Sequence, residues 1–240
     1  MSMLYSLWVW LSCSFLTFIW SSLTLIGGLF GAGQRYMHWI ESNWGKSIIW
    51  ASLIKVEAQG LEHLRMDQPQ IVASNHQSWF DVFSLAAKLP KKFRFVAKEE
   101  LSRIPLFGRA WRICGHISVN RSDRLQAIRI LGHWGDVVRN DNSIIVIFPE
   151  GTRSATGELL PFKKGAFMLA LHTHVDIVPT AVIGSSRVLP KGDWRVRKGR
   201  IIVRFGEPIP TVGYTEKNRE ELVALVRERI QQLKQQVEPA

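Results

Sequence analysis

The chain alternates short apolar runs with amphipathic segments from residue 53 almost to its C-terminal end. Runs of strand length predict strands near residues 53–64, 71–74, 93–97, 115–121, 143–148 and 176–182. Apolar positions at helical spacing predict helices over residues 78–89, 122–139, about 166–171 and from 215 onward. This alternation is typical of an α/β fold, in which helices flank a sheet.

Two local patterns predict how particular strands are placed. Basic and apolar residues alternate on both sides of Lys198 and Gly199, which predicts a β-hairpin over residues 194–205 with arginines on one face. Pro179 interrupts the run at residues 176–182 and has no backbone N–H to donate. We therefore expect an edge strand or a bulge at Pro179.

The N-terminal segment is apolar throughout. No Asp, Glu, Lys or Arg precedes Arg35, and residues 4–30 are dominated by Leu, Trp, Phe, Ile and Val. A membrane-spanning helix needs about 20 apolar residues, so this run is long enough to enter a bilayer. It lacks the positively charged start of a cleavable signal peptide. We expect a retained membrane anchor; the alternative is a core helix of a soluble protein.

Glycines between residues 27 and 33 separate this run from a second, amphipathic stretch over residues 36–54. Either a spanning helix precedes an interfacial one, or a helical hairpin enters one leaflet. Six of the ten tryptophans lie in the first fifty residues, and we expect their indoles at headgroup depth. Every Lys and Arg follows the apolar run, which places the remainder in the cytoplasm. We divide the chain into membrane-anchoring helices over residues 1–54 and a catalytic domain over 55–240.

The first candidate catalytic residue lies in a turn between a strand and a helix. After the strand at residues 71–74, Ser78 is positioned to cap a helix, and Asp81 to complete a capping box. His76 therefore lies at a strand end, with a carboxylate about one helical turn away. Histidine titrates near neutral pH, and a carboxylate on its other ring nitrogen fixes the tautomer. His76 and Asp81 are candidates for a general-base dyad, although Asp81 can also be explained as a cap alone.

A second candidate site follows the strong strand signal at residues 143–148. Gly151 lets the backbone approach a ligand, and Thr152 and Ser154 offer hydroxyl donors. Arg153 offers a guanidinium fork that fits a phosphate. The loop is a candidate phosphate site.

The string N-H-Q-S-W-F-D at residues 75–81 resembles the N-H-x-x-x-x-D signature of the glycerolipid acyltransferases, the family of bacterial 1-acylglycerol-3-phosphate acyltransferases. F-P-E-G-T-R-S at residues 148–154 matches that family's third motif letter for letter. Residues 98–108, 115–121 and 178–179 resemble its other motifs, in the family's order. The resemblance covers nearly all of the chain after residue 53. It implies a single mixed β-sheet flanked by helices, and it favours the N-terminal hairpin.

The resemblance also implies the site residues. His76 would be the base and Asp81 its orienting group. The implied substrate-binding residues are Asn75, Lys98, Arg121, Glu150, Gly151, Thr152, Arg153 and Pro179. Many family members have Asp where this chain has Asn120, so a negative charge at that position is not expected here. Without the resemblance, the favoured interpretation of Lys98 is a solvated surface lysine, and Arg121 can be explained as a plain surface residue.

The charge balance predicts anionic partners, because 31 Lys and Arg against 20 Asp and Glu give a formal net charge of +11. The basic residues are scattered without a nucleic-acid reading module, so we expect no nucleic-acid partner. Two cysteines, Cys13 and Cys114, offer neither a disulfide framework nor zinc-ligand spacing. The chain also lacks the G-x-S-x-G elbow of many serine hydrolases.

The implied reaction moves an acyl group from acyl-CoA or acyl-carrier protein to the free hydroxyl of lysophosphatidic acid, forming phosphatidic acid. A thioester is already activated, so we expect neither a cofactor nor a metal. The expected location is the inner membrane, with the catalytic domain on its cytoplasmic face and anionic lipids as partners. Glycerol-3-phosphate or another lysolipid is the alternative acceptor. A membrane-tethered binder of anionic lipid or nucleic acid is the alternative from another class.

Overall fold

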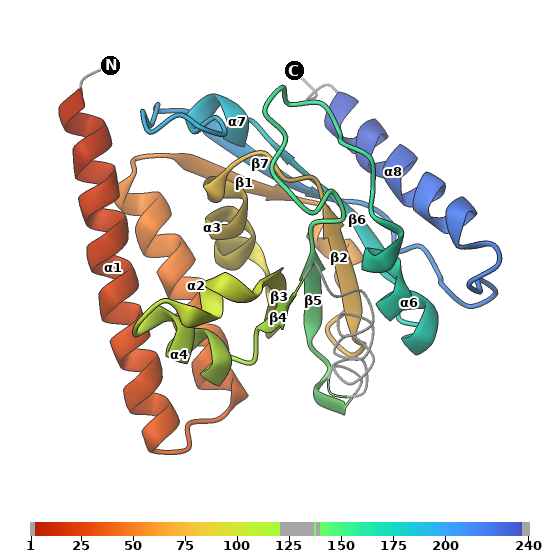
Figure 1. The fold of residues 1–240 in the computed structure, drawn as a ribbon, viewed down its shortest axis with the longest axis horizontal. Helices are drawn as coiled ribbons and strands as arrows, with labels where there is room; N and C mark the ends of the chain where they lie inside the picture. Colours follow the sequence, from red (N-terminus) through yellow and green to blue (C-terminus); the bar gives the residue numbers. More distant parts are fainter. Residues whose placement is uncertain (1–2, 121–136, 138–139, 237–240) are drawn as a thin grey trace.

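One mixed sheet of seven strands organises the computed structural model, which describes residues 3–120, 137 and 140–236 (Figure 1). The strand order is β1-β7-β6-β2-β5-β3-β4. The strands are β1 (Lys55–Gln59), β2 (Gln70–Ser74), β3 (Phe93–Lys98), β4 (Ile117–Val119), β5 (Ile144–Ile147), β6 (Ile177–Ile183) and β7 (Arg200–Phe205). Neighbours are parallel except β6 and β7, which are antiparallel. The predicted α/β class with a single mixed sheet is confirmed.

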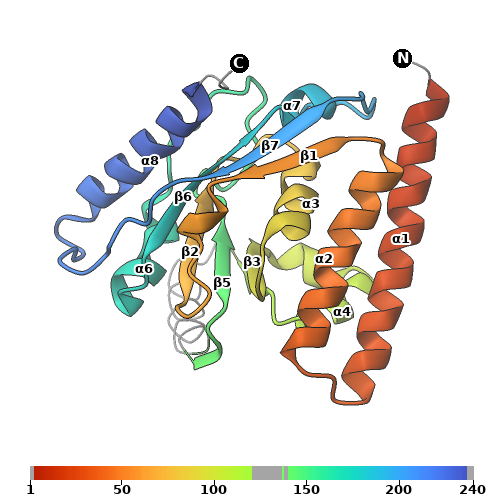
Figure 2. The same ribbon diagram turned by 180° about the vertical axis from the view of Figure 1, so that it is seen from behind.

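Helices cover both faces of the sheet. They are α1 (Met3–Leu29), α2 (Gln34–Ala51), α3 (Trp79–Lys88), α4 (Phe107–Ile113), α6 (Met168–Thr173), α7 (Ser185–Val188) and α8 (Arg219–Gln235), with short 3-10 turns η1 (Leu61–His63), η2 (Glu99–Arg103) and η3 (Lys164–Phe167). Figure 2 shows α1 to α4 on one side and α6 and α8 on the other. The two hydrophobic cores divide β2 accordingly, with Val72 in one and Ile71 and Ala73 in the other. All five residues of β2 are therefore buried.

The parallel pairing brings three strand ends to one edge of the sheet. β2 pairs with β5, with Ala73 opposite Ile147, and β5 pairs with β3 on its other side. Side chains that follow β2, β5 and β3 in sequence therefore emerge together. This register places the turn at His76 beside the loop after Phe148.

The predicted hairpin is wrong, and the prediction for Pro179 is right in one of its two alternatives. β6 lies inside the sheet, between β7 and β2, so it is not an edge strand. A bulge does lie opposite Pro179, because Ile177 and Thr180 are three residues apart whereas their partners Ile209 and Phe205 are four apart. Pro179 of β6 is tolerated because the regular pairing with β7 ends at Phe205, so no partner carbonyl requires a proline N–H. Gly206 N–H donates to Pro179 O, and the next pairing is the isolated bridge between Ile177 and Ile209. The predicted hairpin at residues 194–205 does not form. Only β7 is a strand, and it pairs with β1 and β6, which come from elsewhere in the sequence.

The two arginines within β7, Arg200 and Arg204, do share one face of that strand, because Ile201, Val203 and Phe205 point to the core on the other face. Arg204 is buried, and its guanidinium donates to Gln59 Oε1 and to the backbone carbonyls of Leu233 and Gln236 at the end of α8. Arg200 instead pairs with Glu57 on β1. The predicted helix over residues 122–139 falls almost wholly outside the described residues.

The N-terminal helices form an antiparallel pair, and α1 is the one helix of the described chain that is long and apolar enough to cross a membrane. Only 17% of its most apolar window is buried, which is unlike a core helix of a soluble protein. Its exposed apolar side chains recur at helical spacing: Leu4, Leu7, Leu11, Phe15, Phe18, Ile26 and Leu29. They form one stripe that faces away from the protein.

The opposite side of α1 and most of α2 pack into the protein. Ile48 and Ile49 of α2 belong to the same core as Phe80 and Phe83 of α3, and Gly45 fits against the backbone of Phe83 with no room for a Cβ. Some tryptophans expected at headgroup depth bind protein atoms instead. Trp20 Nε1 donates to Ser47 Oγ, and Trp44 Nε1 donates to Thr17 Oγ1. Trp8, Trp39 and Trp50 remain exposed.

Candidate active site

The turn between β2 and α3 holds a histidine–carboxylate pair. His76 Nδ1 lies 2.9 Å from Asp81 Oδ2, and the Asp81 side chain is fully buried while 16% of the His76 side chain is exposed. Asp81 Oδ2 also accepts hydrogen bonds from the backbone N–H groups of Gln77 and Ser78. With Asp81 Oδ2 as the acceptor, the ring proton of His76 lies on Nδ1 and Nε2 remains as an acceptor.

Local sequence explains this geometry. Ser78 caps α3, because its side-chain oxygen accepts a hydrogen bond from the Phe80 N–H. The Asp81 carboxylate accepts from the Ser78 N–H, which completes the predicted capping box. One carboxylate therefore both closes the helix and orients the imidazole. The two interpretations of Asp81 drawn from the sequence do not exclude each other.

The loop after β5 holds the turn in place. Glu150 is buried, and its two carboxylate oxygens accept from the backbone N–H groups of His76 and Leu160. Burial raises the pKa of Glu150, and these two hydrogen bonds oppose that rise. The ring of Phe148 stacks on the His76 imidazole with centroids 4.1 Å apart. Glu150 and Phe148 therefore fix the position of His76 from the neighbouring strand.

Asn75 has a similar supporting role. Its side-chain amide donates to Val182 O and accepts from Val182 N–H, so it bridges the end of β2 to β6. Asn75 is fully buried, and its amide hydrogen-bonds to the backbone rather than facing a cavity.

Arg153 lies beside the dyad with its guanidinium 5.0 Å from the centre of the Trp79 ring. It forms no hydrogen bond or ion pair with any residue that the structure describes. Burial lowers its pKa, and the Asp81 carboxylate opposes that shift. Gly151 has φ +69°, and a Cβ there would lie 2.7 Å from Lys163 Cε, so a side chain at this position would be strained and crowded. The loop therefore places the half-buried guanidinium of Arg153, which has no hydrogen-bond acceptor among the described residues, next to His76.

A cavity of about 580 Å³ joins these groups to the N-terminal helices. His76, Lys98, Gly151, Thr152 and Arg153 line its polar part. Its apolar wall is formed by residues from α1 to α4, β3 and the segment around η2, which include Trp10, Cys13, Trp44, Trp79, Val82, Phe83, Phe95, Leu101, Ile104, Phe107 and Trp111. The cavity therefore joins a proton acceptor, two cations and an apolar channel. Those are the features needed to bind a phosphorylated amphiphile.

A protein-family model described as Acyltransferase matches residues 55–183. A 1-acyl-sn-glycerol-3-phosphate acyltransferase of Limnanthes alba is 36% identical over 196 residues, which cover 82% of this chain and 68% of that protein. The chain belongs to the acyltransferase family. The predicted family is confirmed.

Further relatives agree with the assignment of this chain to the acyltransferase family. A protein of the same name from Cocos nucifera is 32% identical over 228 residues, covering 90% of this chain and 70% of that protein. The crystal structure of the 1-acyl-sn-glycerophosphate (LPA) acyltransferase PlsC from Thermotoga maritima matches with a TM-score of 0.80 at 25% identity, covering 99% of this chain and 98% of the other. The likeness to PlsC therefore extends over α1 and α2.

Other expected site residues of the acyltransferase lie elsewhere. Pro179 lines a second cavity of about 620 Å³ between β7 and α8, which holds neither His76 nor Arg153. That cavity is slightly larger, but the dyad makes the smaller one the candidate active site. Arg121 lies outside the described residues. The contributions of α1 and α2 to the cavity wall were missed from the sequence, because apolar helix residues carry no motif.

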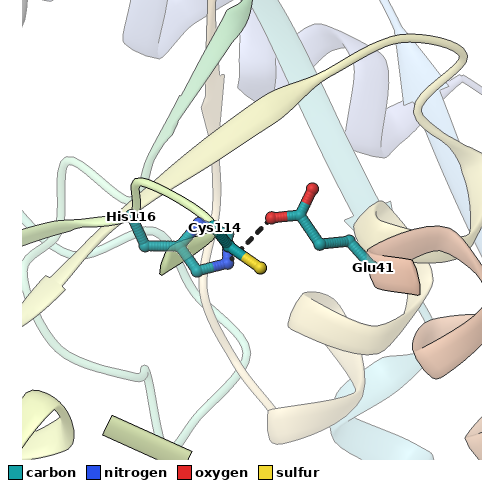
Figure 3. A group of neighbouring side chains, drawn as sticks. All are labelled: Glu41, Cys114 and His116. Carbon is teal, nitrogen blue, oxygen red and sulfur yellow. Dashed lines mark ion pairs between the residues drawn. The ribbon is translucent and has the colours of Figure 1, made fainter. Parts of the chain in front are cut away.

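A second cluster of ionisable side chains lies apart from the dyad, between α2 and the start of β4 (Figure 3). Glu41, Cys114 and His116 bring potential metal-ligand atoms within 4.8 Å of one another. However, His116 Nδ1 accepts from the backbone N–H of Phe95, so the ring proton lies on Nε2, 3.2 Å from Glu41 Oε1. A metal on Nε2 would have to displace that proton. This geometry favours a histidine–carboxyl contact over an open ligand set.

Proposed function

We propose that this acyltransferase moves a fatty acyl group from acyl-CoA or acyl-carrier protein to the free hydroxyl of 1-acylglycerol-3-phosphate, forming phosphatidic acid. The observation that carries the proposal is the His76–Asp81 pair at the mouth of a cavity that also contains Arg153 and has an apolar wall. The names of the relatives supply the acceptor, and the geometry is compatible with it.

In this mechanism His76 Nε2 takes the proton of the acceptor hydroxyl as its oxygen attacks the thioester carbonyl carbon. Asp81 steadies the imidazolium that forms. The tetrahedral intermediate then expels the thiolate, which receives the same proton from His76. The products are the new ester and the free thiol, and His76 returns to its starting state.

The phosphate of the acceptor would bind Arg153, with Lys98 as a second cation. Arg153 is free of protein hydrogen bonds among the described residues, and Lys98 lies at the end of β3 on the same cavity. Charge-assisted bonds to a phosphomonoester would hold the hydroxyl against His76, which lowers the entropic barrier. The donor acyl chain would extend along the apolar wall toward α1.

The same cavity supports placement at a membrane. Its wall includes Trp10, Cys13 and Thr17 of α1, whose opposite stripe is apolar and exposed. A lipid acceptor would thus reach the dyad without leaving the bilayer surface. We place the enzyme at the inner membrane, with residues 55–240 on the cytoplasmic side and anionic lipids around α1.

The test uses purified full-length protein, a labelled oleoyl thioester of CoA or of acyl-carrier protein, and a panel of acceptors. Label in phosphatidic acid that depends on lysophosphatidic acid supports the proposal. Label in lysophosphatidic acid, formed only with glycerol-3-phosphate, would favour the alternative acceptor. Membrane binding with no thioester consumption on any acceptor would favour a tethered lipid or nucleic-acid binder.

Arg153→Ala tests the phosphate assignment. Loss of a charge-assisted pair of about 1.5–3 kcal/mol should raise the KM for the phosphorylated acceptor roughly 10- to 100-fold, with a smaller change in the KM for the thioester. Arg187→Ala, an exposed arginine on α7, is the matched control. An unchanged acceptor KM in Arg153→Ala would remove Arg153 from the phosphate site.

A further inference from the structure

A groove of about 460 Å³ lies on the outer side of η2 and α4. Three arginines line it, Arg103, Arg109 and Arg112, together with Ser102 and the segment 104–106. None of the described residues that line the groove is Asp or Glu. A surface with this charge attracts anions.

The arginines are not equally engaged with the protein. Arg103 pairs with Glu99 at 3.0 Å, and Arg112 Nη1 donates to Ser102 O at 3.1 Å. Arg109 makes no hydrogen bond or ion pair with any residue in the described part of the chain. Within the described part of the chain, Glu99 is the only carboxylate that forms an ion pair with any of the three arginines. The groove therefore retains guanidinium N–H groups for an external acceptor.

The backbone around the groove is tightly constrained. Leu106 has φ +60° and ψ −62°, and Phe107 N–H donates to Pro105 O across it, which is the rare form of the γ-turn. Gly108 lies so close to Ser102 that an added Cβ would be 2.2 Å from Ser102 O. The three arginines are thus carried on a compact, defined support rather than on an open loop.

Apolar side chains border the groove. Ile104 is 45% exposed, and Ile113, next to Arg112, is 40% exposed. A Cβ added at Gly28 of α1 would lie 3.0 Å from Ile113 Cγ2, so the end of α4 touches the exposed membrane helix. Guanidinium groups next to exposed apolar side chains are typical of a protein surface at the lipid headgroup layer.

The groove also adjoins the active site. Ile104 lines both the groove and the cavity that contains His76. We propose that Arg103, Arg109 and Arg112 bind the phosphate headgroup of a membrane lipid beside the mouth of the catalytic cavity, as a site separate from the acceptor phosphate at Arg153. This inference rests on the membrane placement in the proposed function. The bound lipid would hold η2 and α4 at the bilayer, next to the side of the cavity where lipid exchanges.

Vesicle co-sedimentation of the full-length protein tests the proposal. Arg109→Gln combined with Arg112→Gln should weaken binding to phosphatidylcholine vesicles that contain phosphatidic acid by roughly 10- to 30-fold. Binding to vesicles of phosphatidylcholine alone should not change. The matched control is Arg219→Gln with Arg229→Gln on α8, on the opposite face of the sheet, which should retain wild-type binding.

A second double variant distinguishes a defined headgroup site at the arginines from general attraction by positive charge. Arg109→Lys with Arg112→Lys keeps both charges but removes the bidentate forks, so its binding should fall between wild type and the glutamine variant. Wild-type binding by the lysine variant, or an equal loss in the α8 control, would overturn the proposal. Displacement of the protein from vesicles by millimolar inorganic phosphate would also overturn it, in favour of a soluble anion.

The proposed function is tested separately with the wild-type enzyme in neutral detergent micelles, where the lysophosphatidic acid substrate is the only anionic lipid added. Acyl transfer to lysophosphatidic acid in micelles, without selective vesicle binding, would refute the groove alone. Selective binding without transfer would refute the proposed function alone.

Discussion

His76 with Asp81 and His116 with Glu41 are two histidine–carboxyl pairs whose surroundings differ. In the first, Asp81 accepts backbone hydrogen bonds from Gln77 and Ser78, and the His76 ring faces the cavity. In the second, both nitrogens of His116 are occupied, by the Phe95 N–H and by Glu41, and the two side chains are 7% and 5% exposed. A free ring nitrogen at a cavity permits proton transfer, whereas a saturated ring can only support packing.

The carboxyl groups differ as well. Unlike Asp81, Glu41 accepts no hydrogen bond from a backbone N–H of the described residues, and burial raises its pKa to about 8 despite the nearby Lys92 and Arg94. The same burial, with the same two cations, holds the pKa of His116 well below its usual range. The two pairs contain the same kinds of residue. The exposure of the histidine and the backbone N–H groups that donate to the carboxylate therefore distinguish the candidate catalytic pair from the structural one.

The largest expected effect comes from removing each histidine in turn. His76→Ala should lower kcat about 10²- to 10⁴-fold while membrane association and the unfolding temperature stay near wild type. His116→Gln should instead lower the free energy of unfolding by about 1–3 kcal/mol and leave kcat nearly unchanged. Acyl-transfer kinetics and thermal unfolding measure both. His172→Ala, in an exposed pair with Glu216, is the control. A substantially active His76→Ala enzyme would refute the dyad.

Neutralising each carboxyl group gives the next effect. Asp81→Asn keeps an acceptor oxygen but removes the charge that stabilises the imidazolium, so kcat should fall by roughly 10²-fold with little change in KM. Glu41→Gln should leave kcat within about twofold of wild type. Steady-state kinetics with saturating thioester distinguishes the two. Equal losses of kcat in both variants would contradict the division into a catalytic and a structural pair.

The pH dependence of stability should separate the pairs further. With its pKa raised from 4.5 to about 8, Glu41 keeps a proton in the folded state that the unfolded chain releases. The folded state binds more protons across that window, so its contribution to stability falls as pH rises from about 4.5 to 8, by a few kcal/mol at most. Glu41→Gln, neutral at every pH, should flatten this slope. Thermal unfolding across that range provides the measurement, and an unchanged slope would locate the titrating group elsewhere.

The smallest effect concerns the cap that Asp81 shares with Ser78. Ser78→Ala removes the acceptor for the Phe80 N–H and should lower the free energy of unfolding by about 1 kcal/mol. The catalytic loss should be modest, because the Asp81 bonds to His76 and to backbone N–H groups remain. Ser186→Ala, at a half-buried serine on α7, is the control. A loss of kcat as large as that of Asp81→Asn would mean that the cap, rather than the charge, positions His76.

The convergence of the dyad and the Arg153 loop could be predicted because both follow strong strand signals, and parallel strands end at the same edge. The roles of Asn75 and Glu150 could not. Their side chains bind backbone groups of Val182, His76 and Leu160, and those partners depend on strand order. A motif records that a residue is required without recording whether it touches substrate or supports a neighbour that does.

The sequence by itself determined the local features: the capped strand–turn–helix at residues 71–89, the polar loop at 149–154 and the apolar N-terminal helix. Each depends on neighbours within about one or two helical turns, which a periodic pattern encodes directly. Only the tertiary structure decided the interior position of Pro179, the absence of the hairpin and the pairing of Glu41 with His116. These features depend on contacts between segments far apart in the chain. The order of strands in the sheet determines which segments are neighbours, and local propensity does not determine that order.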